Sequence, residues 1–496
     1  MEVEIRDCGQ SDRSQSLKEC TQVDLSNIRG AVHFIGVGGI GMSAIARLLL
    51  EQGMVVSGSD REANSSTREL ERLGARIYVG HRAENVEGAG AIIVSTAITA
   101  DNPEVVAASA KALPVWHRSQ LLAWLSRSSK LVAVSGTHGK TTTTAMVAQV
   151  LLDGGLNPSV VIGGIFSRIA SNSQLGSGEY FVSEADESDG THANAASYMA
   201  VVTNIEADHL ENYPGGIEQI RDHMASFANQ CAKAAVLCQD DLGCRLIRSR
   251  VTRPVITYGL AATSADADYT YESLPGFAMR VLKAGVPLGE IALKVPGEHN
   301  KLDALAAAVV GLELGLTFET VARALSSFAG VARRFQIIGQ QEDITVIDDY
   351  AHHPTEVAAT LKAAVDYIRQ QGEGAGPQPP TSRVVAVFQP HQPRRLKDLW
   401  EEFCRCFDHA DLVIITDVYI ARGQPIEGIT SKHLVSAVRH ADVRYIPGAA
   451  CDLAKQIVQF LQPGDLVLTI GAGDITKVGP EILRLVPPGL SRGRDS

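Results

Sequence analysis

Short apolar runs alternate with longer segments of helical periodicity along most of the chain. The runs at residues 32–36 and 131–136 each end in glycine and precede a helical pattern, the first of which covers residues 42–52. Further runs at residues 384–388 and 412–416 continue the alternation toward the C-terminus. Strands that alternate with helices form parallel sheets covered by helices. The pattern therefore predicts an α/β protein.

The length of the chain predicts several domains. A chain of 496 residues with 45% hydrophobic residues is too long for one core. We expect three α/β domains, at residues 31–128, 129–330 and 331–496. Residues 1–30 are polar and charged, so we expect a disordered extension there. The Gly- and Pro-rich stretch at residues 371–380 predicts a surface loop inside the third domain.

Composition excludes some partners. The 45 Lys and Arg against 56 Asp and Glu give a net charge of -11, which argues against a nucleic-acid protein held by phosphate contacts. No apolar run is long enough to cross a bilayer, and we expect no membrane insertion. The eight scattered cysteines are interpreted as reduced thiols. These features favour a cytoplasmic protein, expected to be a monomer or a weak homodimer.

A glycine-rich loop follows the first predicted strand. It has the pattern G-x-G-x-x-G, and an acidic residue closes the next strand. The residues concerned are Gly36, Gly38, Gly39, Gly41 and Asp60. Such a loop presents backbone N–H groups and a positive helix end to a diphosphate. Taken alone, the pattern suits a dinucleotide site, another diphosphate, or a tight turn without a ligand.

A second loop, at the end of the run 131–136, has the features of a nucleotide-phosphate loop. Its residues are Gly136, Thr137, His138, Gly139, Lys140, Thr141 and Thr142. Lys140 is expected to reach the β- and γ-phosphates of ATP, and the Thr141 hydroxyl to ligate Mg²⁺. Val134 occupies the position of the usual first glycine, so this is a shortened variant of the motif.

Acidic residues and a histidine follow two later strands. Glu184 and Glu187 come just after the run at residues 180–182, and His209 follows the run at residues 201–203. The carboxyl ends of neighbouring parallel strands meet where α/β sheets bind ligands. Glu184 and His209 are therefore predicted Mg²⁺ ligands, whereas Glu187 and Asp189 suit either a metal site or a solvated acidic loop.

Seven motifs together make the chain resemble the Mur ligases, which build the peptide of bacterial peptidoglycan. The resemblance extends from about residue 31 to residue 485. The motifs are GTHGKTTTT (136–144), EADESD (184–189), TNIEADH (203–209), PGEHNKLDA (296–304), DDYAHHPTE (348–356), FQPH (388–391) and GAGDI (471–475).

The resemblance implies a three-domain ligase. It implies an N-terminal Rossmann-like domain that binds a UDP-sugar, a central P-loop ATPase-type domain, and a C-terminal Rossmann-like domain that binds the amino acid. The loop at Gly36 would then hold the UDP diphosphate. Asn300 would lie near the adenine. The residues implied at the alanine and the reacting centre are Tyr350, His352, His391 and Arg395.

Within the family, the histidine of the phosphate loop and DDYAHHPTE indicate the member that joins L-alanine to UDP-N-acetylmuramate. One departure is Gln392, where relatives commonly carry arginine, so the ligand of the alanine carboxylate stays open. In the implied reaction the γ-phosphoryl of ATP activates the lactyl carboxylate as an acyl phosphate, which the amine then attacks. His352, His353 and His391 are candidate bases, although His352 and His353 also suit a helix cap.

Other functions stay open at this point. A recycling ligase that attaches a preformed tripeptide to the same UDP-sugar would carry nearly the same motifs. An NAD-dependent oxidoreductase would explain the loop at Gly36 but not Lys140, and a non-catalytic nucleotide-binding regulator would not need the acidic strand ends. Arg333 and Arg334, between the second and third domains, suit either a solvated charge pair or a contact with the phosphates.

Overall fold

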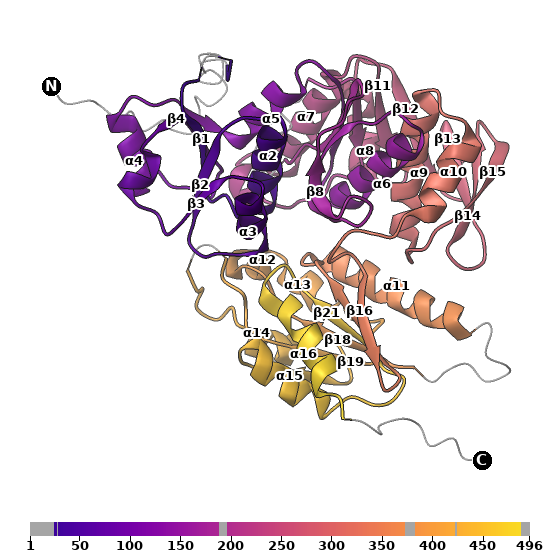
Figure 1. The fold of residues 1–496 in the computed structure, drawn as a ribbon. Coiled ribbons are helices and arrows are strands. Elements are labelled where there is room, and N and C mark those ends of the chain that lie inside the picture. Colours follow the sequence, from indigo (N-terminus) through magenta and orange to yellow (C-terminus); the bar gives the residue numbers. More distant parts are fainter. Residues whose placement is uncertain (1–23, 27, 188–195, 373–381, 422–423, 488–496) are drawn as a thin grey trace. The chain divides into compact units, whose positions relative to one another are not determined.

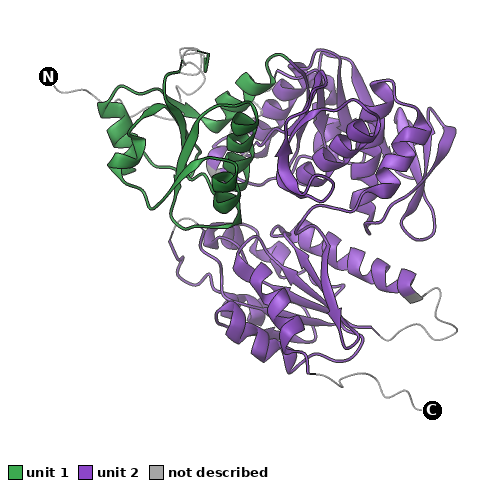
Figure 2. Ribbon diagram, in the orientation of Figure 1, with its two compact units in different colours: residues 1–128 green, residues 129–496 purple. Residues whose placement is uncertain are grey.

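The computed structural model describes residues 24–26, 28–187, 196–372, 382–421 and 424–487. Most of the predicted N-terminal extension and most of the predicted loop at residues 371–380 therefore lie outside the described residues, as does Asp189. The chain forms two compact units, residues 1–128 and residues 129–496 (Figure 2).

The first unit is a parallel five-stranded sheet with the order β3-β2-β1-β4-β5. Its elements are β1 (Ala31–Ile35), α2 (Ile40–Glu51), β2 (Val56–Asp60), α3 (Ser65–Arg72), β3 (Arg76–Val79), η1 (Ala83–Val86), β4 (Ala89–Val94), α4 (Pro103–Ala110), β5 (Val115–His117) and α5 (Arg118–Ser126). The strand order reverses direction beside β1, and ligands of such sheets bind at this reversal. The glycine-rich loop follows β1.

A buried carboxylate ties the first unit together. Glu104, at the start of α4, is fully buried and accepts hydrogen bonds from Ser59 Oγ at 2.6 Å and from Asn85 Nδ2. His33 Nε2 lies 3.5 Å from the same carboxylate. Burial by itself would raise the pKa of Glu104, but the hydrogen bonds from His33, Ser59 and Asn85 outweigh it and lower the pKa to about 2. Glu104 is therefore ionised and satisfied within the core.

The second unit begins with a ten-stranded sheet of the order β15-β14-β13-β12-β11-β10-β6-β9-β7-β8. Figure 1 labels β8 and β11 to β15 of this sheet. Its elements are β6 (Lys130–Ser135), α6 (Lys140–Asp153), β7 (Ser159–Phe166), β8 (Ser171–Gln174), β9 (Tyr180–Glu184), β10 (Met199–Val202), η3 (Leu210–Asn212), α7 (Gly216–Asn229), β11 (Ala234–Cys238), α8 (Leu242–Ile247), η4 (Arg248–Arg250), β12 (Val255–Leu260), β13 (Tyr269–Ser273), β14 (Ala278–Lys283), β15 (Val286–Ala292), α9 (Glu298–Glu313) and α10 (Phe318–Ser327). Strand β6 pairs in parallel with β9 and β10. The phosphate loop, Glu184 and the segment 203–209 therefore leave one edge of the sheet together.

The second unit also contains a six-stranded sheet with the order β16-β17-β21-β18-β19-β20. Its elements are β16 (Gln336–Gln341), β17 (Ile344–Asp349), α11 (Pro354–Gly372), β18 (Val384–Phe388), α12 (Pro393–Asp398), α13 (Trp400–Phe403), β19 (Leu412–Ile415), α14 (Ser431–Ala437), β20 (Val443–Tyr445), α15 (Ala450–Val458), β21 (Leu466–Ile470), η5 (Asp474–Lys477) and α16 (Val478–Leu485). Asp349 and Phe388 are both in register with Ile470 on β21, so the segments after β17 and β18 emerge side by side.

This last sheet lies between two hydrophobic cores. Ala386 and Phe388 of β18 pack into one core, and Val385 and Val387 pack into the other, on the opposite face. Successive side chains of a strand point to opposite faces, so a strand buried on both sides is apolar at every position. The sequence of β18 meets this requirement.

The predicted fold class, α/β with sheets rich in parallel strands, is confirmed. Helix α2 begins two residues before the predicted helix, because Gly39 has the extended conformation of an N-cap, with φ -67° and ψ 144°. Among the described residues, none of the helices has the length and apolar character that a bilayer span requires. The six described cysteines are unpaired thiols.

Candidate active site

The phosphate loop joins β6 to α6 through two glycines with positive φ. Gly136 has φ 137° and Gly139 has φ 78°. A Cβ at Gly136 would lie 2.1 Å from Thr203 Oγ1, and one at Gly139 would lie 2.7 Å from Asp303 Oδ1, so both positions require glycine. No side chain caps the N-terminus of α6. The first amides of α6 and the positive helix end can therefore meet an anion.

Lys140 is partly buried at the start of α6, with its side chain 15% exposed. Its Nζ donates to Gly136 O at 2.6 Å and Thr137 O at 3.1 Å, and lies 2.9 and 3.0 Å from the two carboxylate oxygens of Glu187. Burial lowers the pKa of Lys140, but Glu187 and Asp186 outweigh it and raise the pKa, so the ammonium stays charged. Glu187 is only 5% exposed, which answers the open question of its role: it is the buried partner of Lys140 and not part of a solvated loop.

The structure brings two of the three predicted metal ligands together. Glu184, at the end of β9, accepts a hydrogen bond from Gly163 N at 2.5 Å and another from the side chain of Thr141. Burial raises the pKa of Glu184. His209 has a left-handed backbone, with φ 53°, and its Nε2 lies 3.6 Å from Asp208 Oδ2. Thr141 and Glu184 thus offer oxygen atoms beside Lys140, and the His209 side chain contacts Asp208.

The segment after β10 supports the phosphate loop, a function that the sequence did not reveal. Asn204 Oδ1 accepts from His138 N at 2.8 Å, and Asn204 Nδ2 donates to His138 O at 3.0 Å. Thr203 Oγ1 donates to the same carbonyl at 2.6 Å, and Thr137 Oγ1 accepts from Glu206 N at 2.8 Å. The only sequence signal was the position of TNIEADH at the end of a neighbouring strand.

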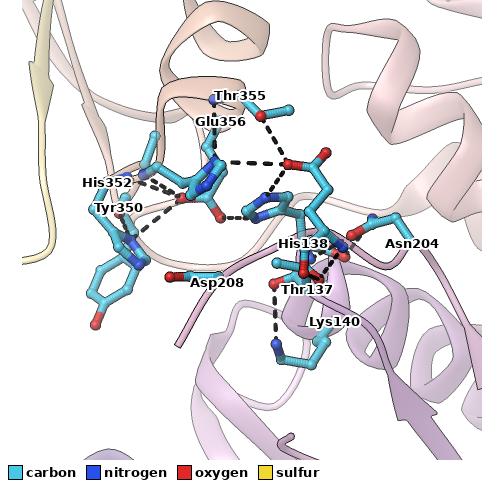
Figure 3. A network of polar contacts seen from close by, with 12 residues as sticks. Thr137, His138, Lys140, Asn204, Asp208, Tyr350, His352, Thr355 and Glu356 are labelled. Atoms are coloured by element: carbon cyan, nitrogen blue, oxygen red, sulfur yellow. Dashed lines mark hydrogen bonds and ion pairs between the residues drawn. The ribbon is translucent and has the colours of Figure 1, made fainter. Parts of the chain in front are cut away.

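His138 was predicted to bind the nucleotide, but its imidazole faces the start of α11 (Figure 3). His138 Nδ1 lies 3.1 Å from Glu356 Oε1, and Nε2 lies 3.4 Å from Glu206 Oε2. Burial lowers the pKa of His138, but Glu206 and Glu356 outweigh it and raise the pKa to about 9. The backbone N–H of His138 donates a hydrogen bond to Asn204. The imidazole and the backbone N–H of His138 therefore both have partners within the protein.

One further group among the described residues has the spacing of a metal site. Single ligand atoms of His138, Glu206 and His353 all lie within 4.8 Å of one another. Two imidazoles and a carboxylate suit a transition metal. A protonated His138 already lies between the carboxylates of Glu206 and Glu356, however, and this arrangement does not require an ion.

The four residues predicted at the alanine and the reacting centre do lie together. The His352 ring centroid is 5.4 Å from that of Tyr350 and 5.8 Å from that of His391. Arg395 Nη1 lies 3.4 Å from His391 Nδ1, and Arg395 Nη2 lies 3.3 Å from Asp208 Oδ2. The Arg395 cation is therefore already paired across to the segment after β10.

His352 is a neutral imidazole. Burial lowers its pKa to about 4. Its Nδ1 lies 3.0 Å from the Tyr350 carbonyl oxygen, which cannot donate, so Nδ1 carries the proton and donates. His352 Nε2 is then the nitrogen with a lone pair, so it can accept a proton.

The remaining predictions for the second unit concern Asn300 and the arginine pair. Asn300, in the first turn of α9, is buried and donates to Pro296 O at 2.6 Å, so its side chain stabilises the turn. Arg333 has φ 61°; its Nε lies 3.3 Å from Asp348, and its Nη2 donates to Gly471 O at 2.7 Å. Arg333 is therefore a structural cation of the last sheet, and not a solvated charge.

The glycine-rich loop of the first unit is held by side chains. Asp60 Oδ2 accepts from Gly38 N at 2.8 Å. Gly39 caps α2 without a side-chain partner, and Gly36 has φ 79°. A Cβ at Gly41 would lie 2.5 Å from a terminal nitrogen of Arg118, a nearby cation that the sequence pattern did not include. The loop therefore combines a helix N-terminus with a cation, as a diphosphate site requires.

Three family models match the chain in succession. They are the Mur ligase family catalytic domain at residues 31–130, the Mur ligase middle domain at residues 134–311, and the Mur ligase glutamate ligase domain at residues 333–473.

Curated relatives match over most of their length. A UDP-N-acetylmuramate–L-alanine ligase of Trichlorobacter lovleyi is 43% identical over 460 residues, covering 91% of this chain and 98% of the relative. The ligase of the same name from Pelotomaculum thermopropionicum is 45% identical over 467 residues, covering 91% and 97%.

Solved structures of Mur ligases are also similar to this chain. The crystal structure of a UDP-N-acetylmuramate-alanine ligase of Thermotoga maritima superimposes with a TM-score of 0.76 at 30% identity, covering 92% of this chain and 98% of that one. A murein peptide ligase of Psychrobacter arcticus has a TM-score of 0.69 at 21% identity, covering 92% and 98%, and this likeness concerns the fold alone.

Proposed function

The chain belongs to the Mur ligase family, and on that premise we propose that it joins L-alanine to the lactyl carboxylate of UDP-N-acetylmuramate, with conversion of ATP to ADP and phosphate. The observation that carries the proposal is the meeting of two clusters in the second unit. The phosphate loop with Lys140 and the cluster around His352 and Arg395 are linked through Asp208 and Glu356.

The nucleotide end of the site suits phosphoryl transfer. The amides at the start of α6 receive the phosphates, and the charged Lys140 neutralises the oxygen charge that develops as the γ-phosphoryl moves to the lactyl carboxylate. Lys140 must leave Glu187 in part to do so, and Glu187 keeps it protonated until then. The product of this step is an acyl phosphate on the substrate.

The donor set beside Lys140 fits Mg²⁺. Thr141 and Glu184 offer oxygen, the ligand type that Mg²⁺ prefers, and His209 is the third proposed ligand. When bound, the ion would screen the negative charge of the phosphates.

The amino-acid end of the site suits attack by an amine. The alanine amine must lose a proton to become a nucleophile, and the neutral His352, with its lone pair on Nε2, is the proposed acceptor. Arg395, with His391 beside it, is proposed to face the alanine carboxylate with its cation. The amine then displaces phosphate from the acyl group, and the amide bond forms.

The glycine-rich loop of the first unit is proposed to hold the UDP diphosphate, through the α2 N-terminus and Arg118. With UDP-N-acetylmuramate as its substrate, the enzyme would contribute to peptidoglycan precursor synthesis in the cytoplasm. An NAD-dependent activity is not proposed, because it leaves Lys140 and its partners without a role.

The test is ADP release with purified protein, ATP, Mg²⁺, UDP-N-acetylmuramate and each standard amino acid in turn. We expect release with L-alanine that stops when the UDP-sugar is omitted. Tight binding of NAD together with no ADP release under any combination would contradict the proposal.

A further inference from the structure

Glu356 contacts both halves of the proposed site. Its Oε2 accepts from the backbone N–H of His352 at 3.0 Å and of His353 at 3.3 Å. Its other oxygen, Oε1, lies 3.1 Å from His138 Nδ1 in the phosphate loop. One carboxylate therefore touches the segment that carries His352 and the loop that carries Lys140 (Figure 3).

The position of Glu356 at the start of α11 explains the contacts of its Oε2. Pro354 opens the helix, and Glu356 stands in its first turn, where a carboxylate satisfies amides that the helix leaves unbonded. This capping function uses Oε2. It fixes the backbone of His352 and His353, but it does not require Oε1 to face another sheet.

The contact of Glu356 Oε1 with His138 joins α11 to the phosphate loop. His138 is clamped by its backbone to Asn204, and Lys140 lies two residues further along the loop. A shift of the His138 ring relative to α11 would therefore shift the loop that positions Lys140. A second link runs in parallel, since Thr355 Oγ1 donates to Glu206 Oε2 at 3.0 Å and Glu206 faces His138 from its other side.

Burial makes the pair sensitive to substitution. The side chains of His138 and Glu356 are 12% and 14% exposed, so water screens their attraction weakly. Burial would raise the pKa of Glu356, but the hydrogen bond and the positive charge of His138 act against it, and the pKa of Glu356 lies well below its ordinary value. The pair therefore consists of an imidazolium and a carboxylate, and a metal at His138 would first have to displace its proton.

We propose that Glu356 is a positioning residue of the ligase reaction, whose carboxylate aligns the segment carrying His352 with the phosphate loop through the imidazole of His138. The inference rests on the proposed function. It assigns Glu356 no contact with substrate. The residue acts by holding His352 and Lys140 in a fixed position relative to each other when the amine attacks the acyl phosphate.

The experiment is a double-mutant cycle of Glu356→Gln, His138→Gln and the double variant. Glu356→Gln keeps an oxygen that can cap α11, and His138→Gln leaves the cap untouched. We expect each single variant to lower kcat roughly 10- to 100-fold with the Kd for ATP within about twofold, because a misplacement of about 1 Å is enough for such a loss. The double variant should be no slower than the slower single variant.

Two controls separate this inference from others. Glu319→Gln changes an exposed first-turn glutamate of α10 that takes no part in the contacts described above, and should leave kcat unchanged. Wild-type ADP release with L-alanine is measured first, and its absence would overturn the proposed function itself. With an active wild type, unchanged kcat in His138→Gln, or losses that multiply in the double variant, would overturn the positioning role alone.

Discussion

Removal of Lys140 tests the nucleotide end of the site and its electrostatics together. Lys140→Ala should abolish ADP release and leave binding of the UDP-sugar nearly intact, because the cation serves the nucleotide phosphates. It should also destabilise the second unit, since the carboxylate of Glu187 is 5% exposed and loses its partner. Breaking a buried ion pair by removing one member costs about 3–5 kcal/mol.

The destabilisation should depend on pH with a defined sign. Burial raises the pKa of Glu187 to about 7, even though Lys140 opposes this rise. Without Lys140 the pKa rises further, so the folded variant keeps Glu187 protonated, whereas the unfolded chain ionises it above about pH 4.3. The folded variant then binds more protons than the unfolded chain, and its stability falls by ~1.4 kcal/mol per pH unit. Between about pH 7 and pH 8.5 the variant should lose ~2 kcal/mol relative to wild type.

Urea unfolding at these two pH values measures the effect. The double variant Lys140→Ala/Glu187→Gln is the matched control, because it removes the titrating group: it should lose the extra pH dependence and remain inactive. A Lys140→Ala variant that unfolds in parallel with wild type at both pH values, or that releases ADP at the normal rate, would refute this reasoning.

Three further predictions concern the other groups. Glu104→Gln should destabilise the first unit by ~1–3 kcal/mol at neutral pH. Because the pKa of Glu104 is lowered, wild type should lose this advantage in stability as the pH falls from about 4.5 to about 2. If the thermal stabilities of the two proteins change in parallel over that pH range, the assigned pKa of Glu104 is wrong. Glu184→Ala and His209→Ala should each raise the Mg²⁺ concentration needed for half-maximal activity, and titrations that superimpose on wild type would exclude both as ligands. Asp60→Ala should weaken binding of UDP-N-acetylmuramate and leave ATP binding unchanged, since its carboxylate holds Gly38; calorimetry with each ligand checks this.

The sequence predicted those features of the site that follow from strand order and from the spacing of residues along the chain. Thr141 and Glu184 could be placed together because β6 and β9 are neighbouring parallel strands whose ends share an edge. The cluster of His352, His391 and Arg395 came from resemblance, and the register of β17 and β18 with β21 explains its proximity.

Contacts between remote segments were not predictable in this way. The pairing of Lys140 with Glu187 depends on the path of the loop after β9, which periodicity does not define. The turn of the His138 ring toward Glu356 depends on how two sheets of the second unit meet. Neither leaves a signature in residue spacing, because each partner is an ordinary polar residue until the backbone brings it within about 3 Å of the other.

The choice between a free amino acid and a peptide tests the central claim most directly. Free L-alanine presents a carboxylate one carbon from its amine, and Arg395 beside His391 offers a buried cation for it. In a tripeptide that begins with alanine this carboxylate is an amide, so its ion pair with the Arg395 cation does not form, at a cost of a few kcal/mol, or a factor on the order of hundreds. We predict that kcat/KM with UDP-N-acetylmuramate is larger for L-alanine than for the tripeptide by about that factor. Equal values, or a preference for the tripeptide, would contradict the assignment.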